Sequence, residues 1–415
     1  MLPQRGLWTR FGFYICELVY EFVMDKVVGF GGPYSPSLKK FVTFKKSNRE
    51  GPVPNNVSKT TMLAIAAAAT ATVAATAPAS AQETINLTAI SGYPPPATWI
   101  GSLVDAYLPA VDAILAKTGT YKINWNKGIS GQIVKPRGEL EGVESGIGDL
   151  GVIVTAFHAD KVPLYDVSFK TPFSTLDVGL VSAVTQKMIA TFPQYNETWL
   201  KEFNQVPLQS TGAVDNYMLW SKKPITSITQ VKGLKVGAAG PNLPWVLAIG
   251  AAGVQTNLAD AYNSLSTGIY EAMIVWRQGA GAFKLCEPAP FAFDASLGAV
   301  NGFSLNFNRD VWEGLPEEVQ SAMAAASPAW TTENVKRVNN GAQWGLARCE
   351  KEFGTKVTKA SNEERLAWAK ALPPLGKQWA EQRNKAGQPG TEILSAWMTE
   401  MRAANQPIAR HWDRD

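Results

Sequence analysis

The sequence has little of the chemistry that most enzymes and metalloproteins need. Its 415 residues include 2 His and 3 Cys, and no H-E-x-x-H, C-x-x-C or G-x-S-x-G motif occurs. His158 and His411 cannot form a zinc site with the cysteine spacings present. The paired carboxylates of Glu139 and Glu141 fall on a polar helical face, where such groups are usually solvated. The sequence therefore predicts no catalytic residues, no metal site and no cofactor.

Long leucine-rich runs are also absent, and the one long uncharged stretch is residues 61–81, "TMLAIAAAATATVAATAPASA". Its length approaches the roughly 20 residues of a membrane-spanning helix. However, the run is Ala-rich, Lys59 precedes it, and Ala79 and Ala81 match the A-x-A pattern of a signal-peptidase site. We therefore interpret it as an export signal cut after Ala81. This predicts a periplasmic protein that is not embedded in the membrane after cleavage.

Residues 1–56 do not fit that interpretation, because secretory signals begin at or near the N-terminus. The apolar stretch "FGFYICELVYEFVM" is short and is interrupted by Glu17 and Glu21. We interpret residues 1–56 as an extension upstream of the true translation start, with Val57 as the initiator. Residues 57–81 are then the signal peptide and residues 82–415 the mature protein.

The formal net charge of +4 disappears with the leader. Residues 1–81 carry 9 of the 39 Lys and Arg and 4 of the 35 Asp and Glu, which leaves 30 and 31 in the mature chain. This balance argues against a nucleic-acid partner. Cys16 leaves as well, so that Cys286 and Cys349 remain in a compartment that permits disulfides. Whether they form a bridge or stay as two buried thiols is left open by their spacing.

Alternating and continuous apolar runs predict the start of an α/β fold. Residues 83–90 and 121–126 alternate as half-buried strands, and residues 149–157 form a continuous apolar run typical of a central parallel strand. Residues 97–119 and about 135–145 have helical spacing. Strand–helix–strand–helix–strand is the order of a doubly wound sheet.

The middle of the chain repeats this pattern. Residues 216–221, 234–239, 271–276 and 302–308 read as strands, with helices near 243–252 and 259–267, and the chain is helical after Leu315. Two α/β lobes with a cleft between them and a helical C-terminal region are therefore expected.

Aromatic side chains are plentiful, with 14 Trp among them. Doubly wound sheets bind ligands beyond the carboxyl ends of their strands. Tyr93, Phe157, Trp276 and Arg277 follow or end predicted strands, and Trp245 begins the helix after Gly240. Around an interlobe cleft these residues would form an aromatic pocket with few polar groups, which suits a small molecule.

Three segments in order give the chain a resemblance to a known family. They are "GISGQIVKPRGELEGVESGIGDLGVIVTAFHADKVPLYDVSFKTPF" (128–173), "LWSKKPITSITQVKGLKV" (219–236) and "AIGAAGVQTNLADAYNSLSTGIYEAMI" (248–274). They resemble the DctP-like substrate-binding proteins of TRAP (tripartite ATP-independent periplasmic) transporters, and the resemblance spans nearly all of residues 84–405. It implies a two-lobed periplasmic-binding-protein fold of type II-like form that delivers a small solute to membrane permease subunits.

The resemblance also implies an anion clamp, and this chain departs from it. The family grips a carboxylate with an arginine at the end of a strand "LKIRV", and "LKVGA" places Gly237 at that position. A second family arginine corresponds to Asn216, and the asparagine and proline of a "GQENP" segment correspond to Val275 and Trp276. The "KGLKVGAAG" stretch (232–240) lacks the third glycine of a dinucleotide fingerprint and the lysine of a P-loop, so it does not predict a phosphate site either.

Two versions of the solute follow. In the first, the solute is an organic acid held by another cation, with Arg277 as the candidate. In the second, it is an amine or neutral molecule that lies against Tyr93, Phe157, Trp245 or Trp276, with Glu271 as a counter-charge, because aromatic faces attract ammonium groups. An exported enzyme on this fold is disfavoured by the missing nucleophile and base. A scavenging receptor without its own permease remains a further alternative.

Overall fold

The computed structural model describes residues 82–414. The interpreted extension (1–56), the export signal (57–81) and the cut after Ala81 lie outside these residues. Within residues 82–414, no helix is long and apolar enough to cross a membrane.

The first sheet has five strands in the order β2-β1-β3-β10-β4. Strands β1, β2 and β3 run parallel, whereas β10 is antiparallel to both β3 and β4. The central strand β3 is buried at every position, as its uninterrupted apolar run predicts. The bounds are β1 (Glu83–Ile90), β2 (Tyr121–Gly128), β3 (Leu150–Val154), β4 (Gln205–Val214) and β10 (Val300–Asn308).

The second sheet has six strands in the order β11-β9-β5-β8-β6-β7. Strand β5 pairs antiparallel with β8 and β9, and β6 pairs parallel with β7 and β8. Both β5 and β8 are buried along their whole length. The bounds are β5 (Tyr217–Ser221), β6 (Lys235–Ala238), β7 (Ala252–Gln255), β8 (Ala272–Trp276), β9 (Phe291–Asp294) and β11 (Lys356–Lys359).

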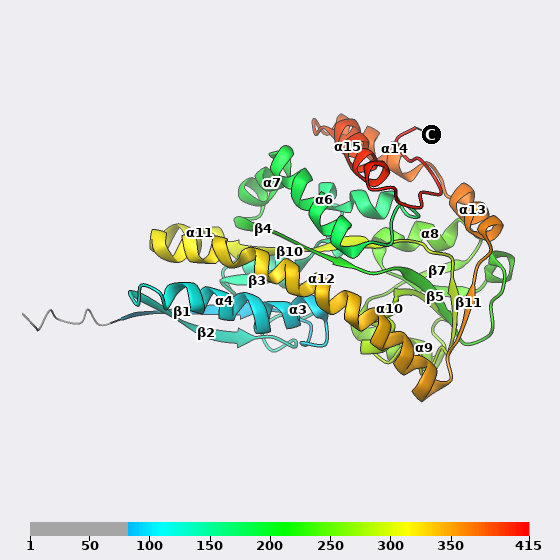
Figure 1. Cartoon of the computed structure of the whole chain (residues 1–415), viewed down its shortest axis with the longest axis horizontal. Helices are drawn as coiled ribbons and strands as arrows, with labels where there is room; N and C mark the ends of the chain where they lie inside the picture. Colours follow the sequence, from blue (N-terminus) through cyan, green and yellow to red (C-terminus); the bar gives the residue numbers. More distant parts are fainter. Residues whose placement is uncertain (1–81, 415) are drawn as a thin grey trace, which may run out of the picture. The chain divides into compact units, whose positions relative to one another are not determined.

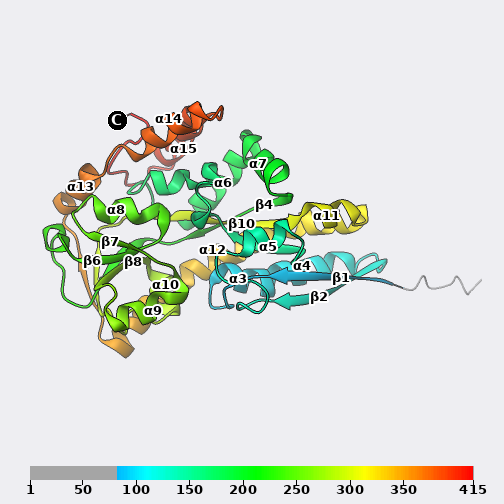
Figure 2. The ribbon, with the colours of Figure 1, turned by 180° about the vertical axis from the view of Figure 1, so that it is seen from behind.

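Three segments connect the two sheets, so the protein has two lobes. The chain passes from β4 to β5 through Asp215 and Asn216, and it returns from β9 to β10 through residues 295–299. The third connection is the long helix α12 (Glu317–Phe353), which packs on α3, α4 and β4 before it reaches α10. Figures 1 and 2 show α12 running from beside α11 to beside α9 and α10. The predicted α/β two-lobed fold is confirmed.

Helices cover both lobes, and the C-terminal ones are fastened by tryptophans. The indole N–H groups of Trp368, Trp379 and Trp412 donate to the carbonyls of Trp245, Pro163 and Pro172. The remaining helices are α3 (Thr98–Ser102), α4 (Leu108–Leu115), α5 (Glu139–Glu144), α6 (Val178–Thr191), α7 (Gln194–Glu202), α8 (Leu243–Leu247), α9 (Leu258–Thr267), α10 (Arg277–Ala282), α11 (Arg309–Gly314), α13 (Asn362–Ala371), α14 (Leu375–Lys385) and α15 (Gly390–Ala403).

The two cysteines that the sequence left open form a disulfide. Cys286, just after α10, is bonded to Cys349 in α12, with 5.7 Å between their Cα atoms. The two helices cross at a pair of glycines, because a Cβ atom on Gly281 would lie 2.3 Å from the Cα atom of Gly345. Backbone contact and a covalent bond therefore fix α10 to α12.

The structure corrects several predicted boundaries. The helix expected over residues 135–145 begins only at Glu139, and residues 135–138 form a turn instead. The expected helix near 243–252 ends at Leu247, because the chain then enters β7. Elements that were not predicted from the sequence are β4, β7, β9, β11, α6, α7, α10 and α11.

Candidate functional site

A small cavity lies between the two lobes. Its walls come from the ends of β3, β4 and β10 in the first lobe and from β8 and the segments after β6 and β7 in the second. This is the place where open α/β sheets bind ligands. The lining residues are Tyr93, Trp99, Val154, Ala156, Phe157, Phe169, Val214, Tyr217, Ala239, Asn242, Thr256, Asn257, Leu258, Met273, Ile274, Val275, Trp276, Gly302 and Phe303.

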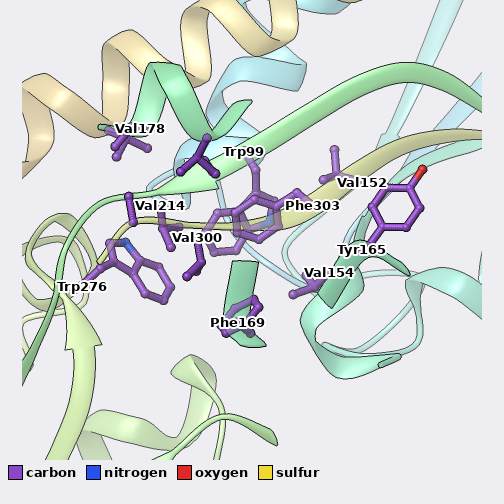
Figure 3. Close-up of a cluster of buried hydrophobic side chains, with 14 of the residues drawn as sticks. Trp99, Val152, Val154, Tyr165, Phe169, Val178, Val214, Trp276, Val300 and Phe303 are labelled. Atoms are coloured by element: carbon purple, nitrogen blue, oxygen red, sulfur yellow. The ribbon is translucent and has the colours of Figure 1, made fainter. Parts of the chain in front are cut away.

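Aromatic rings dominate the cavity wall. Trp99 and Phe303 stack with 4.2 Å between ring centroids and 19° between planes, and Figure 3 shows their rings overlapping above Phe169. Tyr217 meets Trp276 edge to face, with centroids 5.5 Å apart. Such contacts contribute about 0.5–1.5 kcal/mol per pair beyond the area that they bury. The rings therefore form a preorganised apolar surface that suits a flat or compact apolar solute.

One amide is buried in this apolar wall without a protein partner. Asn242 is fully buried, and neither its Oδ1 nor its Nδ2 atom is hydrogen-bonded within residues 82–414. It ends the short 3₁₀ turn of residues 240–242, which begins after β6 and packs against the turn of residues 155–157. An unsatisfied buried polar group costs about 1–3 kcal/mol. Asn242 therefore offers a donor and an acceptor that a bound solute can satisfy.

A cation lies at the rim of the same cavity. The guanidinium carbon of Arg137 is 4.4 Å from the ring centroid of Phe157, and Nη2 donates to the carbonyl of Thr256 at 3.3 Å. The Nε atom of Arg137 is buried and has no hydrogen-bond partner in the described part of the chain. Thr256 and Asn257 line the cavity and also an open hollow next to it, which Arg137 lines too. Arg137 thus contacts both lobes at the cavity edge.

The backbone of Arg137 is strained. The Gly138 N–H donates to the Lys135 carbonyl at 2.9 Å, and Arg137 has φ of 76°. With Pro136 before it, this is the pattern of a type II turn, whose third residue is normally Gly or Asn. A side chain in the left-handed region costs about 1–2 kcal/mol. Strained non-glycine residues cluster at ligand sites, and here the strain accompanies a cation at a cavity rim.

A buried carboxyl, that of Glu139, lies two residues after Arg137 at the start of α5. Its Oε1 atom accepts from the Gly92 N–H at 2.9 Å, and its Oε2 atom has no partner among the described residues. Burial raises the pKa of Glu139 to about 7. Burial also raises the pKa of the Tyr93 hydroxyl; the Glu139 charge acts in the same direction and the Arg137 charge opposes it. The phenol of Tyr93 is therefore neutral at physiological pH.

Of the site residues predicted from the sequence, Tyr93, Phe157 and Trp276 line the cavity. Two others lie behind its wall. Trp245 is fully buried, packs on Phe169 and Tyr217, and donates to the Phe169 carbonyl at 3.0 Å.

Asn216 is also buried and bonds within the fold. Its Nδ2 atom donates to Asp294 at 2.8 Å, and its Oδ1 atom accepts from the Gly298 N–H at 3.1 Å. Asn216 therefore joins the two sequence-distant segments that connect the sheets.

The remaining three predicted residues are not brought to the cavity. At Gly237, a Cβ atom would lie 2.8 Å from ring atoms of Tyr270, so that this ring occupies the space of the absent side chain. Glu271 is exposed and contributes backbone hydrogen bonds with Lys235 and Lys222. Arg277 donates from Nε to the buried carboxylate of Asp215 at 2.9 Å.

Sequence reasoning missed Trp99, Asn242 and Arg137. The segment "KPRG" carried a usable signal for Arg137, because an arginine follows proline where a type II turn favours glycine. Nothing in the sequence signalled Asn242, whose isolation depends on the apolar residues that fold around it.

Two α/β lobes with an aromatic cavity between them fit a solute receptor. Comparison with known families agrees with this class. The family model of bacterial extracellular solute-binding protein, family 7 (DctP), matches residues 116–383, which is more than half of the chain. The chain belongs to this family, and it is a substrate-binding protein of TRAP-type transport, as the sequence predicted.

Solved structures share the fold at low identity. A TRAP periplasmic solute-binding protein from Bordetella bronchiseptica, with bound mandelate, is 18% identical, covers 77% of this chain and 99% of its own, and has a TM-score of 0.67. One from Rhodoferax ferrireducens, with copurified benzoate, is 17% identical, covers 77% and 98%, and has a TM-score of 0.65. The ectoine-binding protein of Halomonas elongata is 18% identical, covers 77% and 100%, and has a TM-score of 0.63.

Proposed function

We propose that this receptor captures a small organic acid with a compact, preferably aromatic, body and delivers it to TRAP-type permease subunits. The observation that carries this proposal is the unpartnered Asn242 amide inside a mostly apolar cavity. The rings of Trp99, Phe303 and Trp276 would cover the solute body. Asn242 would then hydrogen-bond its polar end, which removes the cost of the empty amide.

The similar structures support this class of solute. Their bound molecules include mandelate in the Bordetella bronchiseptica protein and benzoate in the Rhodoferax ferrireducens protein. Both are small carboxylates with one ring, which matches the aromatic wall described above. The proposal includes export to the periplasm with removal of residues 1–81; N-terminal sequencing of the processed protein is expected to begin at Gln82.

A neutral or amine solute is the second candidate. The Asn242 amide presents both a donor and an acceptor, and a neutral amide or lactam would satisfy both. Aromatic faces also attract ammonium groups, by about 0.5–2 kcal/mol.

A thermal-shift panel separates the two candidates. We would test residues 82–415 against benzoate, (R)-mandelate, pyroglutamate, ectoine, benzamide and benzylamine. A solute at 100 times its Kd stabilises the folded protein by about 2.7 kcal/mol. We expect the carboxylates to raise Tm most. If only benzamide or benzylamine raises Tm, the organic-acid proposal is wrong.

A matched pair of variants tests the role of Asn242. Asn242→Leu keeps a similar volume but removes the amide, so the affinity for the solute should fall at least tenfold while the unliganded protein keeps or gains stability. Asn263→Leu is the control, because Asn263 is exposed on α9 and lines only the open hollow. Equal affinities of the two variants would contradict the proposed site.

A further inference from the structure

We infer that Arg137 binds the carboxylate of the solute and thereby sets the receptor's preference for an anion. This inference rests on the proposed function, and it names the charge-reading group of that site. Arg137 lies in the turn between β2 and α5, away from the strand ends that the sequence pointed to.

Unused donors of the Arg137 guanidinium are the first support. A guanidinium has five N–H donors in a fixed planar fork. One of them reaches the Thr256 carbonyl at 3.3 Å, near the long end of a hydrogen bond. The buried Nε donor has no partner, and Arg137 forms no ion pair within residues 82–414. The fold thus leaves Arg137 without a carboxylate partner among these residues.

Its position is the second support. The guanidinium lies over Phe157, whose ring lines the cavity, and contacts Thr256, which lines the cavity from the other lobe. Asn242 is close by, because its 3₁₀ turn packs on the turn that carries Phe157. A small acid with its ring among the aromatic side chains can therefore direct its carboxylate to Arg137 at the rim. Bidentate binding of a carboxylate is what the planar guanidinium favours.

Other charged groups around the rim are already engaged. Lys135 donates from Nζ to the Gly131 carbonyl at 3.0 Å, and Arg277 is paired with Asp215. Asp260 lines the open hollow with Arg137, but its carboxylate accepts from Asn257 Nδ2 at 2.8 Å. Among these cations, Arg137 is the one whose guanidinium lies over a ring of the cavity wall and pairs with no carboxylate in the described part of the chain.

The strained turn is the third support for a role of Arg137 in binding. It also allows a substitution that fits the backbone. Arg137 has φ of 76°, which glycine adopts without strain. A glycine would serve the Lys135–Gly138 turn better than arginine, so the turn itself does not explain the side chain. Arg137→Gly therefore removes the cation while it fits the backbone, and a loss of binding in this variant cannot be attributed to a misfolded turn.

The experiment is calorimetric titration of three acids and their neutral amides: benzoate, (R)-mandelate and pyroglutamate against benzamide, mandelamide and pyroglutamide. The proteins are the unmodified chain, Arg137→Gly, Arg137→Gln and Arg137→Lys. Arg348→Gln is the control, because Arg348 also lies over an aromatic ring, that of Trp344 on α12, but pairs with Glu352. We expect the unmodified chain to bind at least one acid at least tenfold more tightly than its amide.

Arg137→Gly and Arg137→Gln should lose at least tenfold in affinity for the acid, keep the affinity for the amide, and so abolish the preference. Arg137→Lys should fall between them, because it keeps the charge without the planar fork. If both neutral variants bind the acid within threefold of the unmodified chain, Arg137 is not the carboxylate-binding group, although the proposed function stands. If the unmodified chain binds only amides, or none of the six compounds, the inference fails together with the proposed solute class.

Discussion

Two arginines lie near the interlobe cavity, and they differ in whether a carboxylate of the protein pairs with them. Arg277 begins α10, and its charge is neutralised by Asp215, whose side chain is 1% exposed. Arg137 lies in a strained turn and meets a ring and a carbonyl but no carboxylate among residues 82–414. An arginine beside a ligand cavity is available to a ligand only if the fold has not already paired it. The comparison therefore separates a structural arginine from one that we propose to be functional.

The surroundings of Arg277 explain what its pair does. Asp215 lies in the connection from β4 to β5, and it also accepts from the Gln278 N–H at 3.2 Å. Helix α10 is then held to α12 by the disulfide of Cys286 and Cys349. Arg277 therefore helps to join the β4–β5 connection to helix α10, and the disulfide joins α10 to α12. Arg137, in contrast, makes one hydrogen bond across the cavity rim, to the Thr256 carbonyl.

The largest loss of stability is expected when the disulfide between α10 and α12 is removed. Cys286→Ala/Cys349→Ala removes a crosslink over a sequence separation of 63 residues. The chain-entropy estimate for a loop of that size is a loss of about 4 kcal/mol. Urea unfolding would measure it, with the affinity for the solute expected to stay within threefold because neither cysteine lines the cavity. A loss below about 1 kcal/mol, or a reducing agent that leaves the unmodified chain equally stable, would contradict the assignment.

Arg277→Ala is expected to destabilise the protein by about 3 kcal/mol, because it leaves the buried Asp215 without its cation. Arg348→Ala is the control, since its partner Glu352 is 48% exposed and surface pairs contribute about 0–1 kcal/mol. Urea unfolding at pH 8 measures both variants. Equal losses in the two variants would remove the distinction between a buried and a surface pair.

The pH dependence of that loss follows from Asp215. Burial raises its pKa to about 6, although Arg277 and the Gln278 N–H both act to lower it. The folded carboxyl therefore binds its proton more tightly than the unfolded one, whose pKa is about 3.9. Its contribution to stability is complete below that pKa and is lost as the pH rises through about 6. The cost of Arg277→Ala should thus be smaller at pH 5 than at pH 8, and Asp215→Asn/Arg277→Ala should recover stability at pH 8. A cost that does not change with pH would show that Asp215 is not the cause.

A third position sharpens the comparison: Gly237, where the family resemblance implied an arginine. Gly237→Ala should cost about 2 kcal/mol, since the new methyl group would lie 2.8 Å from the Tyr270 ring and overpacking typically costs 1–3 kcal/mol. The ring cannot turn away freely, because its hydroxyl bonds Thr256 and the Ala261 carbonyl. Gly314→Ala is the control, as no atom lies within 4 Å of its added Cβ. Urea unfolding in which both variants lose equally little would mean that Tyr270 does not fill this space.

The sequence predicted the parts of the fold whose signal is local. Strand β1 was predicted from its alternating apolar residues, and β8 was predicted from its continuous apolar run. Both signals are local, because they reflect which faces of the strand are buried and not the identity of the residues that cover them. Strand β4 was missed because its sequence carries Pro207 and Gly212. A Cβ atom on Gly212 would lie 2.9 Å from Trp330, so this glycine is required by packing from a helix more than a hundred residues away.

The site was predictable to the same extent. Tyr93, Phe157 and Trp276 were found because they lie at strand ends, where the sheet topology alone directs ligands. Asn242 and Arg137 could not be found in this way. Their proposed roles depend on side-chain atoms that have no hydrogen-bond partner in the folded protein. Whether an atom lacks a partner is decided by the three-dimensional packing.

The smallest change in stability is expected for Arg137→Gly, the variant that best separates the two arginines. Arg137→Gly relieves a left-handed backbone strain of about 1–2 kcal/mol. It also loses the contact with the Phe157 ring, worth about 0.5–1 kcal/mol, and a long hydrogen bond of similar value. These terms nearly cancel, so the unliganded variant should unfold in urea within about 1 kcal/mol of the unmodified chain. A loss near 3 kcal/mol, like that of Arg277→Ala, would place Arg137 among the structural arginines, because a residue kept for a solute should cost the empty receptor almost nothing to remove.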